Sequence, residues 1–517
     1  MESSRNAVTN AESNRPPHDC MKRRTFIRSV ATGAAVTALG NISLGAAPGK
    51  GKAGKKSKGS QHATPAGFRA GAATSNITPA LGVVLDGTIM QIGPAKHVHD
   101  ELHARCLALD DGTTRVAFVV CDTTMISREL VDRARQLISQ NTGIPPSHIL
   151  ISATHTHSSP RLIDLGLGDA NRRYEDFAVQ RMADGVQRAI NNLAPARLGW
   201  GSVQKPEHVF NRRWLLKPDH SLVNPFGEKT DRAWMYPGKE VALEPAGPVD
   251  PEVAFLAVQH TDGRPLAVLA NYALHYVGGI PAGNISADYF GAFSRRLEEL
   301  LTAPQQDPLF VAMMSNGTCG DVSNNRVGDF GAPRPTLPAY GNMRYVGHDL
   351  AEAVATACKT VQYQDRPTLA VVESEISLGI RRPDAARLEW AKQTAVPGPA
   401  SNKLTRPQIY AREALHLAKM PAHEPVRLQA FRIGDIAIGA IPCEVFAETG
   451  LAIKKQSTAR HTFVIELANG FHGYLPTPRQ HELGGYETWP ARSSHLEVAA
   501  SEKIQAETLR LLGLPRL

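Results

Sequence analysis

Apolar and polar residues alternate along the chain in a pattern that predicts both strands and helices from about residue 67 onward. Pairs of apolar runs joined by short turns predict hairpins over 105–121, 252–272 and 427–441. Single apolar runs, typical of buried strands, occupy 148–153, 309–314 and 461–467. Helical periodicity predicts helices over 127–142, 174–193, 288–301, 345–361 and 494–512. Together these elements predict a mixed α/β fold in one large domain.

Two stretches, 214–247 and 380–424, are poor in strand signals and are expected to be insertions or covering segments. The chain has 517 residues, of which 42% are hydrophobic and 21% are charged. This composition is typical of globular proteins. No apolar run approaches the roughly 18 residues that span a bilayer, which excludes a polytopic membrane protein.

The formal net charge of +8 is concentrated at the N-terminus. Residues 1–66 hold 11 of the 57 Lys and Arg residues but only three of the 49 Asp and Glu residues. Residues 67–517 therefore hold 46 of each sign and have no net charge. A basic surface that binds nucleic acid is not expected on this part of the chain.

The basic N-terminal segment resembles a twin-arginine export signal. Lys22–Arg28 contains paired arginines, and a weakly apolar stretch rich in Gly and Ala follows at 30–40. An ordinary basic tail is the alternative. We expect an export signal at 1–47, a basic flexible linker at 48–66 and the catalytic domain at 67–517. The mature protein is then expected to be periplasmic or extracellular, without a transmembrane segment. Contact with a membrane surface stays open.

The linker contains a glycine pattern, Gly49–Gly54, with the spacing of a nucleotide-binding motif. We reject it as a nucleotide site because no predicted strand precedes it and no predicted helix follows. The cysteines are equally uninformative about a site. With Cys20 in the signal, five remain, an odd number without C-x-x-C spacing. They are expected to be buried small apolar residues rather than a disulfide framework or a thiolate zinc site.

Residues that bind metals or move protons follow five of the predicted strands. In chain order they are His155 and His157, His275, the segment 320–325, Glu444, and the segment 469–474. Ligand sites in α/β sheets gather at the carboxyl ends of strands, so we expect a metal site there. Residues i and i+2 of an extended segment point the same way. His155 and His157 are therefore expected to face one cleft.

In this order, the segments resemble the neutral (alkaline, non-lysosomal) ceramidases, which are zinc amidases. The resemblance covers roughly residues 67–490. The matching segments are Thr154–Pro160, Asn211–Arg213, Asn271–His275, Gly320–Asn325, Pro442–Glu444 and Tyr474–Tyr486. The resemblance implies one Zn²⁺ per chain, held by His155, His275, Glu444 and Tyr474, with a position left for water. It also implies that zinc activates water and polarises the scissile amide carbonyl.

The same resemblance implies roles for four further residues. His157 acts as general base and then general acid, and Arg212 and Tyr486 orient the substrate and stabilise the oxyanion. Ser323 corresponds to the family's essential serine, which is either a nucleophile or a positioning group. We favour positioning, because activated water makes a serine nucleophile redundant and no G-x-S-x-G motif is present.

Some positions depart from the family's pattern. Ser158–Leu162 stands where the family has a glycine-rich stretch, Asn324 replaces a proline, Cys443 replaces a glycine, and a double arginine is missing at 451–452. The family's C-terminal immunoglobulin-like domain is not expected after the helix at 494–512. These changes leave the implied metal ligands in place but weaken the expectation of a sphingolipid substrate.

A second group of histidines competes for the metal. His97, His99 and His103 lie beside Asp100 and Glu101, in a spacing that is neither H-E-x-x-H nor H-x-x-E-H. A polar entry loop is the alternative interpretation of this segment.

The leading prediction is an exported zinc amidase that acts on ceramide or a related N-acyl lipid. One alternative keeps the zinc but changes the substrate to another N-acyl amine, a lactone or an ester. The other is an exported ligand-binding relative that has lost its chemistry.

Overall fold

The computed structural model describes residues 67–85, 93–163, 169–327, 337–398 and 404–513. The predicted export signal, the linker and Cys20 lie outside these residues. No helix in the described part of the chain is long and apolar enough to cross a membrane.

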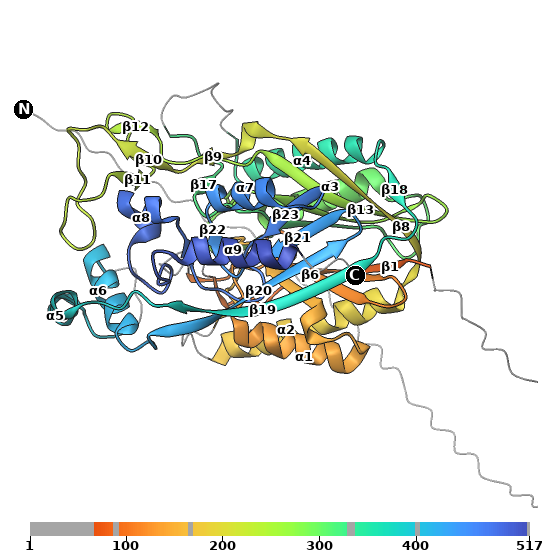
Figure 1. Ribbon diagram of the computed structural model, residues 1–517, viewed down its shortest axis with the longest axis horizontal. Coiled ribbons are helices and arrows are strands. Elements are labelled where there is room, and N and C mark those ends of the chain that lie inside the picture. The colour runs from red at the N-terminus through yellow and green to blue at the C-terminus, as the bar shows by residue number, and fades with distance from the viewer. Residues whose placement is uncertain (1–66, 86–92, 164–168, 328–336, 399–403, 514–517) are drawn as a thin grey trace, which may run out of the picture. The chain divides into compact units, whose positions relative to one another are not determined.

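The largest sheet supports the mixed α/β fold that the sequence predicts (Figure 1). Its strands lie in the order β16-β14-β13-β8-β1-β5-β6-β7, and β18 (Tyr363–Gln364) pairs with β8. Their bounds are β1 (Arg69–Asn76), β5 (His103–Asp110), β6 (Arg115–Cys121), β7 (Ile149–Ala153), β8 (Ala194–Gln204), β13 (Glu252–His260), β14 (Pro265–Tyr272) and β16 (Val311–Asn316). The predicted hairpins β5–β6 and β13–β14 are confirmed. At the two ends of the sheet, β7 pairs parallel to β6 and β16 parallel to β14.

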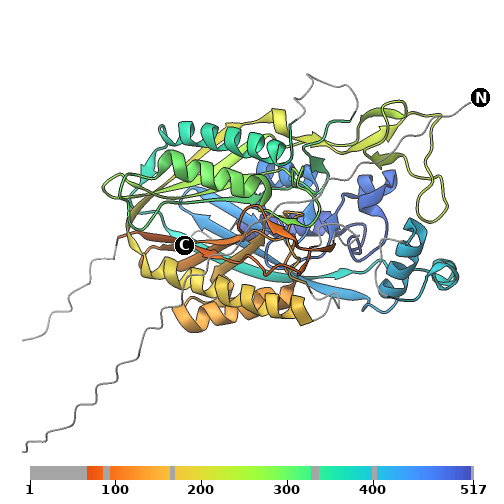
Figure 2. The ribbon, with the colours of Figure 1, turned by 180° about the vertical axis from the view of Figure 1, so that it is seen from behind.

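Four helices cover one face of this sheet, as Figure 2 shows from behind. They are α1 (Arg128–Thr142), α2 (Asp169–Asn191), α3 (Asp288–Leu301) and α4 (Gly341–Cys358). Alternate side chains of the strands, such as Val119 and Phe255, pack against them. The bounds of α1 follow from its caps. The Ser127 side chain accepts a hydrogen bond from the Leu130 N–H, and Gly143 ends the helix in a left-handed conformation, with φ 73°.

A second sheet packs on the opposite face of the first. Its order is β19 (Leu369–Gly379), β20 (His423–Ile433), β21 (Ile436–Ala440) and β23 (His461–Ile465). The other alternate set of side chains fills the space between the sheets, with the Phe118 and Phe431 rings 4.8 Å apart. Helices α7 (Ala447–Gln456) and α9 (Ala500–Leu512) cover its outer face. The result is a four-layer arrangement of helices, two sheets and helices.

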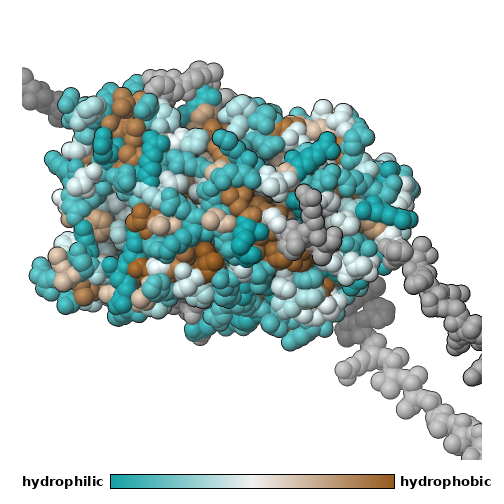
Figure 3. Space-filling model, viewed as in Figure 1, coloured by the Kyte–Doolittle hydropathy of each residue, from teal (hydrophilic) through white to brown (hydrophobic). Residues whose placement is uncertain are grey.

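The face of the molecule on which α9 lies is mostly polar, with scattered apolar patches (Figure 3). A shallow groove between β19 and α9 is lined partly by Ile376, Leu378 and Ala506.

The cysteines behave as the sequence predicts. In the described residues they are free thiols, all buried except the half-buried Cys358.

Two expectations about the elements need correction. The stretch 214–247 is not without strands, because β10 (Arg213–Leu216), β11 (Ala233–Met235) and β12 (Ala242–Pro245) form a small sheet. Strands of three or four residues are too short to show a period of two. The stretch 380–424 carries helices α5 (Ala385–Thr394) and α6 (Arg406–Leu417), on either side of residues that the structure does not describe. The closing helix begins at Ala500, six residues later than predicted.

Candidate active site

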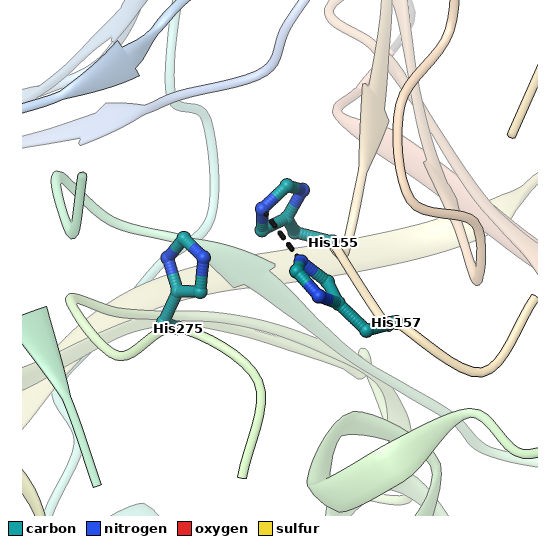
Figure 4. A group of neighbouring side chains, drawn as sticks. All are labelled: His155, His157 and His275. Carbon is teal, nitrogen blue, oxygen red and sulfur yellow. Dashed lines mark hydrogen bonds between the residues drawn. The ribbon is translucent and has the colours of Figure 1, made fainter. Parts of the chain in front are cut away.

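Three histidines meet where β7 and β14 end (Figure 4). His155 and His157 follow β7, and His275 follows β14. The Nε2 atoms of His155 and His157 are 3.1 Å apart, and the rings of His155 and His275 are 4.4 Å apart. His155 and His275 are both buried. The structure therefore brings together the histidines that the sequence singled out.

The histidine pair faces one site for a different reason from the one expected. His155 is not in an extended strand, because its φ is 66° and it lies in the left-handed region. Its N–H donates to the carbonyl of Thr123 instead of continuing the ladder of β7. A non-glycine residue in this conformation is uncommon and is held by its surroundings. The turn, rather than a pleat of period two, brings the two imidazoles together.

Backbone carbonyls orient the two deepest imidazoles. His155 Nδ1 lies 2.7 Å from the carbonyl oxygen of Thr124, and His275 Nδ1 lies 3.3 Å from that of Cys319. A carbonyl oxygen can only accept, so each Nδ1 carries the proton and each Nε2 is left with a lone pair. A second partner of this kind is what orients histidine ligands in metal sites.

Glu444 completes the group from the second sheet's side. Its Oε2 lies 3.4 Å from His155 Nε2 and 3.9 Å from His275 Nε2. This oxygen is buried and has no hydrogen-bond partner among the described residues. Buried polar atoms are normally paired. Two nitrogen lone pairs and an unpaired carboxylate oxygen around one point fit a divalent cation.

Tyr474 is placed next to Glu444 by a short parallel pair of strands. In this pair, β22 (Glu444–Val445) and β24 (Tyr474–Leu475) set Glu444 opposite Tyr474. The ring of Tyr474 lies 5.8 Å from that of Tyr486 and 5.4 Å from the guanidinium carbon of Arg212. Burial raises the pKa of Tyr486 to about 12, with a further contribution from Glu444.

Arg212 is held by a carboxylate that the sequence reasoning missed. Its Nε donates to Glu487 Oε1 at 2.8 Å, and Arg213 Nη1 donates to Glu487 Oε2 at 2.8 Å. Burial alone raises the pKa of Glu487, but the two guanidiniums outweigh it and hold that pKa below its usual range. Arg212 Nη2 also donates to the carbonyl of Gly320 at 2.8 Å. Arg212 is therefore fixed beside Tyr474.

With this geometry in view, comparison with known proteins is informative. The family model described as neutral/alkaline non-lysosomal ceramidase, N-terminal, matches residues 68–335. The chain belongs to this ceramidase family. The match includes His155, His157, Arg212, His275 and Ser323. The remaining implied residues, Glu444, Tyr474 and Tyr486, follow the matched range.

Individual members of the family are distant from this chain. Neutral ceramidase B of Dictyostelium discoideum is 25% identical over 250 residues, which are 46% of this chain and 32% of that protein. The chain thus matches about a third of that relative's length. The crystal structure of neutral ceramidase from Pseudomonas aeruginosa has a TM-score of 0.61 at 17% identity, covering 86% of this chain and 74% of the other. A ceramidase complexed with C2 gives a TM-score of 0.62 at 17% identity, with coverage of 86% and 75%. These structures confirm the ceramidase fold.

A second carboxylate missed by the sequence reasoning, Glu466, supports this ceramidase-family site from behind. It directly follows β23, so the rule that pointed to the other strand ends could have found it. Its Oε2 accepts from the N–H groups of Cys319 at 3.1 Å and Val445 at 2.7 Å. These bonds join the segment whose Cys319 carbonyl orients His275 to the strand that carries Glu444. The side chain is fully buried, and burial raises its pKa well above the usual range.

Ser323 ends the short strand β17 (Val322–Ser323), which follows a tight turn close to the arginine. Its Oγ exchanges hydrogen bonds with the backbone of Asn325, at 3.3 and 3.2 Å. The turn starts at Gly320, where an added Cβ would lie 2.4 Å from the carbonyl oxygen of Glu444. Only glycine fits this close approach. The turn therefore presents the Gly320 carbonyl to Arg212.

A cavity of about 180 Å³ opens beside His157. Leu85, Tyr276 and the segment 278–284 form most of its wall. The His157 ring stacks on Tyr276, with centroids 3.8 Å apart. Burial, together with the positive charge of neighbouring Arg212, lowers the pKa of His157 well below its usual range. A neutral imidazole, able to accept a proton, therefore borders the cavity.

The competing histidines are not brought together. His99 stacks on Tyr340, with ring centroids 3.5 Å apart, and His103 approaches Glu101 at 3.7 Å. Asp100 instead accepts hydrogen bonds from Ser286 Oγ at 2.6 Å and the Ala287 N–H at 2.7 Å. Within the described ranges, these side chains form no group of three converging ligand atoms. The segment fits the alternative interpretation, a polar loop.

Proposed function

We propose that this chain is a zinc-dependent amidase that hydrolyses the N-acyl bond of ceramide or a related N-acyl lipid. One observation carries the proposal. His155 Nε2, His275 Nε2 and the unpaired Glu444 Oε2 converge beside His157 at the edge of a cavity. Membership in the ceramidase family supports the reaction class.

The donor set favours zinc. Two imidazole nitrogens and one carboxylate oxygen form the ligand set of several catalytic zinc sites. Tyr474, which pairs with Glu444 across β22 and β24, would be the fourth ligand. Two atoms bound to one tetrahedral ion at 2.0–2.2 Å lie about 3.3–3.6 Å apart. The contact of 3.4 Å between His155 Nε2 and Glu444 Oε2 agrees with this spacing. When bound, the ion would supply Lewis-acid activation of water and of the amide carbonyl.

The remaining residues would move the proton and hold the substrate. His157 would take a proton from the attacking water at its free nitrogen and return it to the leaving amine. Arg212, fixed by Glu487, and Tyr486 would donate to the developing oxyanion. Ser323 would act by positioning, which its hydrogen bonds to its own turn support.

One structural feature favours the alternative with a different amide or ester substrate. The segment that is glycine-rich in the family is tied down here by side chains. Thr123 Oγ1 donates to the carbonyl of Pro160 at 2.7 Å, and Thr124 Oγ1 lies 3.2 Å from Ser159 Oγ. A fixed segment without glycines limits how closely its backbone can approach a ligand.

Zinc analysis of the purified protein combined with a substrate panel tests the proposal. The panel contains N-acylsphingosines, N-acyl amino acids and simple esters. We expect bound zinc and hydrolysis of N-acylsphingosine, and in His155→Ala the loss of activity and of the zinc ion held at this site. His103→Gln, in the competing histidine segment, is the matched control and should keep both. Hydrolysis confined to another substrate would favour the alternative, and a wild-type protein without zinc or activity would favour the non-catalytic one.

A further inference from the structure

A second group of two histidines and a glutamate lies outside the candidate active site. Glu424 stands near the start of β20, His472 lies in the loop just before β24, and His495 precedes α9. Glu424 Oε1 lies 2.7 Å from His472 Nδ1 and 2.5 Å from His495 Nε2. Both histidines are buried, whereas the Glu424 side chain is 17% exposed. The group is therefore close to solvent at one edge.

The hydrogen bonds of His495 leave a lone pair facing the carboxylate. Its Nδ1 lies 2.9 Å from the carbonyl oxygen of Arg492, so this nitrogen carries the proton of the neutral ring. The other nitrogen, Nε2, then points a lone pair at Glu424 Oε1. Two lone pairs at 2.5 Å repel each other unless a positive species is shared between them. That species is either an extra proton or a metal ion.

The orienting carbonyl is itself firmly held. Glu413 accepts hydrogen bonds from the N–H, Nε and Nη2 of Arg492, at 3.0, 2.9 and 2.6 Å. The direction of His495 Nε2 is thus fixed in the same way as the directions of His155 and His275, by a carbonyl behind the ring.

Glu424 has no permanent cation to neutralise it. Among the described residues, its ion pairs are with His472 and His495 alone. A third histidine–carboxylate group, Glu207, His208 and Asp349, differs in this respect. There, Lys205 Nζ lies 2.6 Å from both carboxylates and supplies the positive charge.

We propose that Glu424, His472 and His495 bind a second zinc-type divalent cation, with water in the fourth position. Imidazole nitrogen and carboxylate oxygen are ligands that zinc takes. The ligand atoms would have to move apart by up to about 1 Å, from hydrogen-bond distance to the spacing around a tetrahedral ion. The three ligands come from separate segments, so the ion would tie β20 to the loop that leads into β24 and to the segment before α9.

Zinc counting in the full chain tests this site independently of the proposed function. The protein is loaded with zinc, desalted and analysed by mass spectrometry of its metal content. Wild type is expected to hold two zinc ions per chain. Glu424→Gln keeps the side-chain shape but removes the charge, and should hold one, as should His495→Gln. The matched control His208→Gln, in the group that already has a lysine, should hold two.

The active-site variant separates the two sites. His155→Ala should lose the other ion and keep the one at Glu424, so its zinc count reports on that site alone. The proposal is wrong if both Glu424→Gln and His495→Gln hold as much zinc as wild type. Titration of the metal-free proteins with Co²⁺ gives a second readout. Visible absorption of wild type should rise up to two equivalents of Co²⁺. If wild type and His155→Ala both saturate at one equivalent, and the double variant His155→Ala/His495→Gln shows no rise, that single ion lies at Glu424. Absorption by His155→Ala/His495→Gln equal to that of His155→Ala would overturn the site.

Discussion

Two kinds of carboxylate that contact basic side chains can be compared in this protein, and their neighbours separate them. Among the described residues, Glu444 and Glu424 form ion pairs with histidines alone, whereas Glu487 pairs with two arginines and Asp349 with a lysine as well as a histidine. The second kind is neutralised by a permanent charge that the chain itself supplies. The first kind is not, and the carbonyls behind His155, His275 and His495 turn the lone pairs of these rings toward the carboxylate. Where a lysine or arginine of the chain supplies the positive charge, the carboxylate forms a structural ion pair. Where a histidine–carboxylate group lacks that charge, we infer a metal site.

The two groups that lack a permanent cation also differ from each other. Around Glu444 the contacts are 3.4 and 3.9 Å, too long for hydrogen bonds and suited to an ion between them. Around Glu424 they are 2.7 and 2.5 Å, which are hydrogen-bond distances. The first group is spaced for a cation as it stands. The second must open, so a mild chelator should remove its ion first.

The largest effect is expected from Glu444→Gln. This change keeps the shape of the side chain but removes the charge that faces His155 and His275. We expect zinc at this site to be lost and turnover to fall to background, while the second ion stays. Metal content and activity measured on the same preparation check this. Full activity in a variant that has lost its zinc would separate the chemistry from the metal.

His157→Ala should give the next largest effect. The imidazole is the proposed proton carrier but not a proposed ligand, so kcat should fall by roughly 10²–10⁴ with zinc content unchanged. Single-turnover kinetics and metal analysis measure the two quantities. Equal loss of zinc in His157→Ala and His155→Ala would mean that the roles are wrongly divided between these residues.

Glu487→Gln tests the other kind of carboxylate. It leaves Arg212 and Arg213 buried without their counter-charge, which is expected to lower the free energy of unfolding by about 3–5 kcal/mol. The pKa of Glu487 is lower in the folded chain than in the unfolded one. Its contribution is therefore present above pH about 4.3 and is lost as the pH falls through the lower folded value. Denaturant unfolding at several pH values should show a flatter acid limb in the variant, and an unchanged limb would contradict this.

The sequence predicts those parts of the molecule that depend on local pattern. The β5–β6 and β13–β14 hairpins and the exact bounds of α3 follow from periodicity and turn residues. Contacts between residues that are far apart in the sequence do not follow from such patterns. Arg212 and Glu487 are 275 positions apart, and Glu424 and His495 are 71 apart, so no motif joins them. The resemblance to ceramidases reached His155 and Glu444 only because family motifs carry what spacing cannot.

Lys205→Met is expected to have the smallest effect and sharpens the comparison most directly. It removes the permanent cation from Glu207 and Asp349, two carboxylates that are partly exposed, so the free energy of unfolding should fall by no more than about 1 kcal/mol. The same change leaves Glu207 and Asp349 beside His208 but without a permanent positive charge. Glu424 is in the same situation. If a missing permanent charge is what makes such a group bind metal, this variant should take up more zinc than wild type. An unchanged zinc count would show that the carbonyl behind His495, which orients its lone pair, matters more than the missing charge.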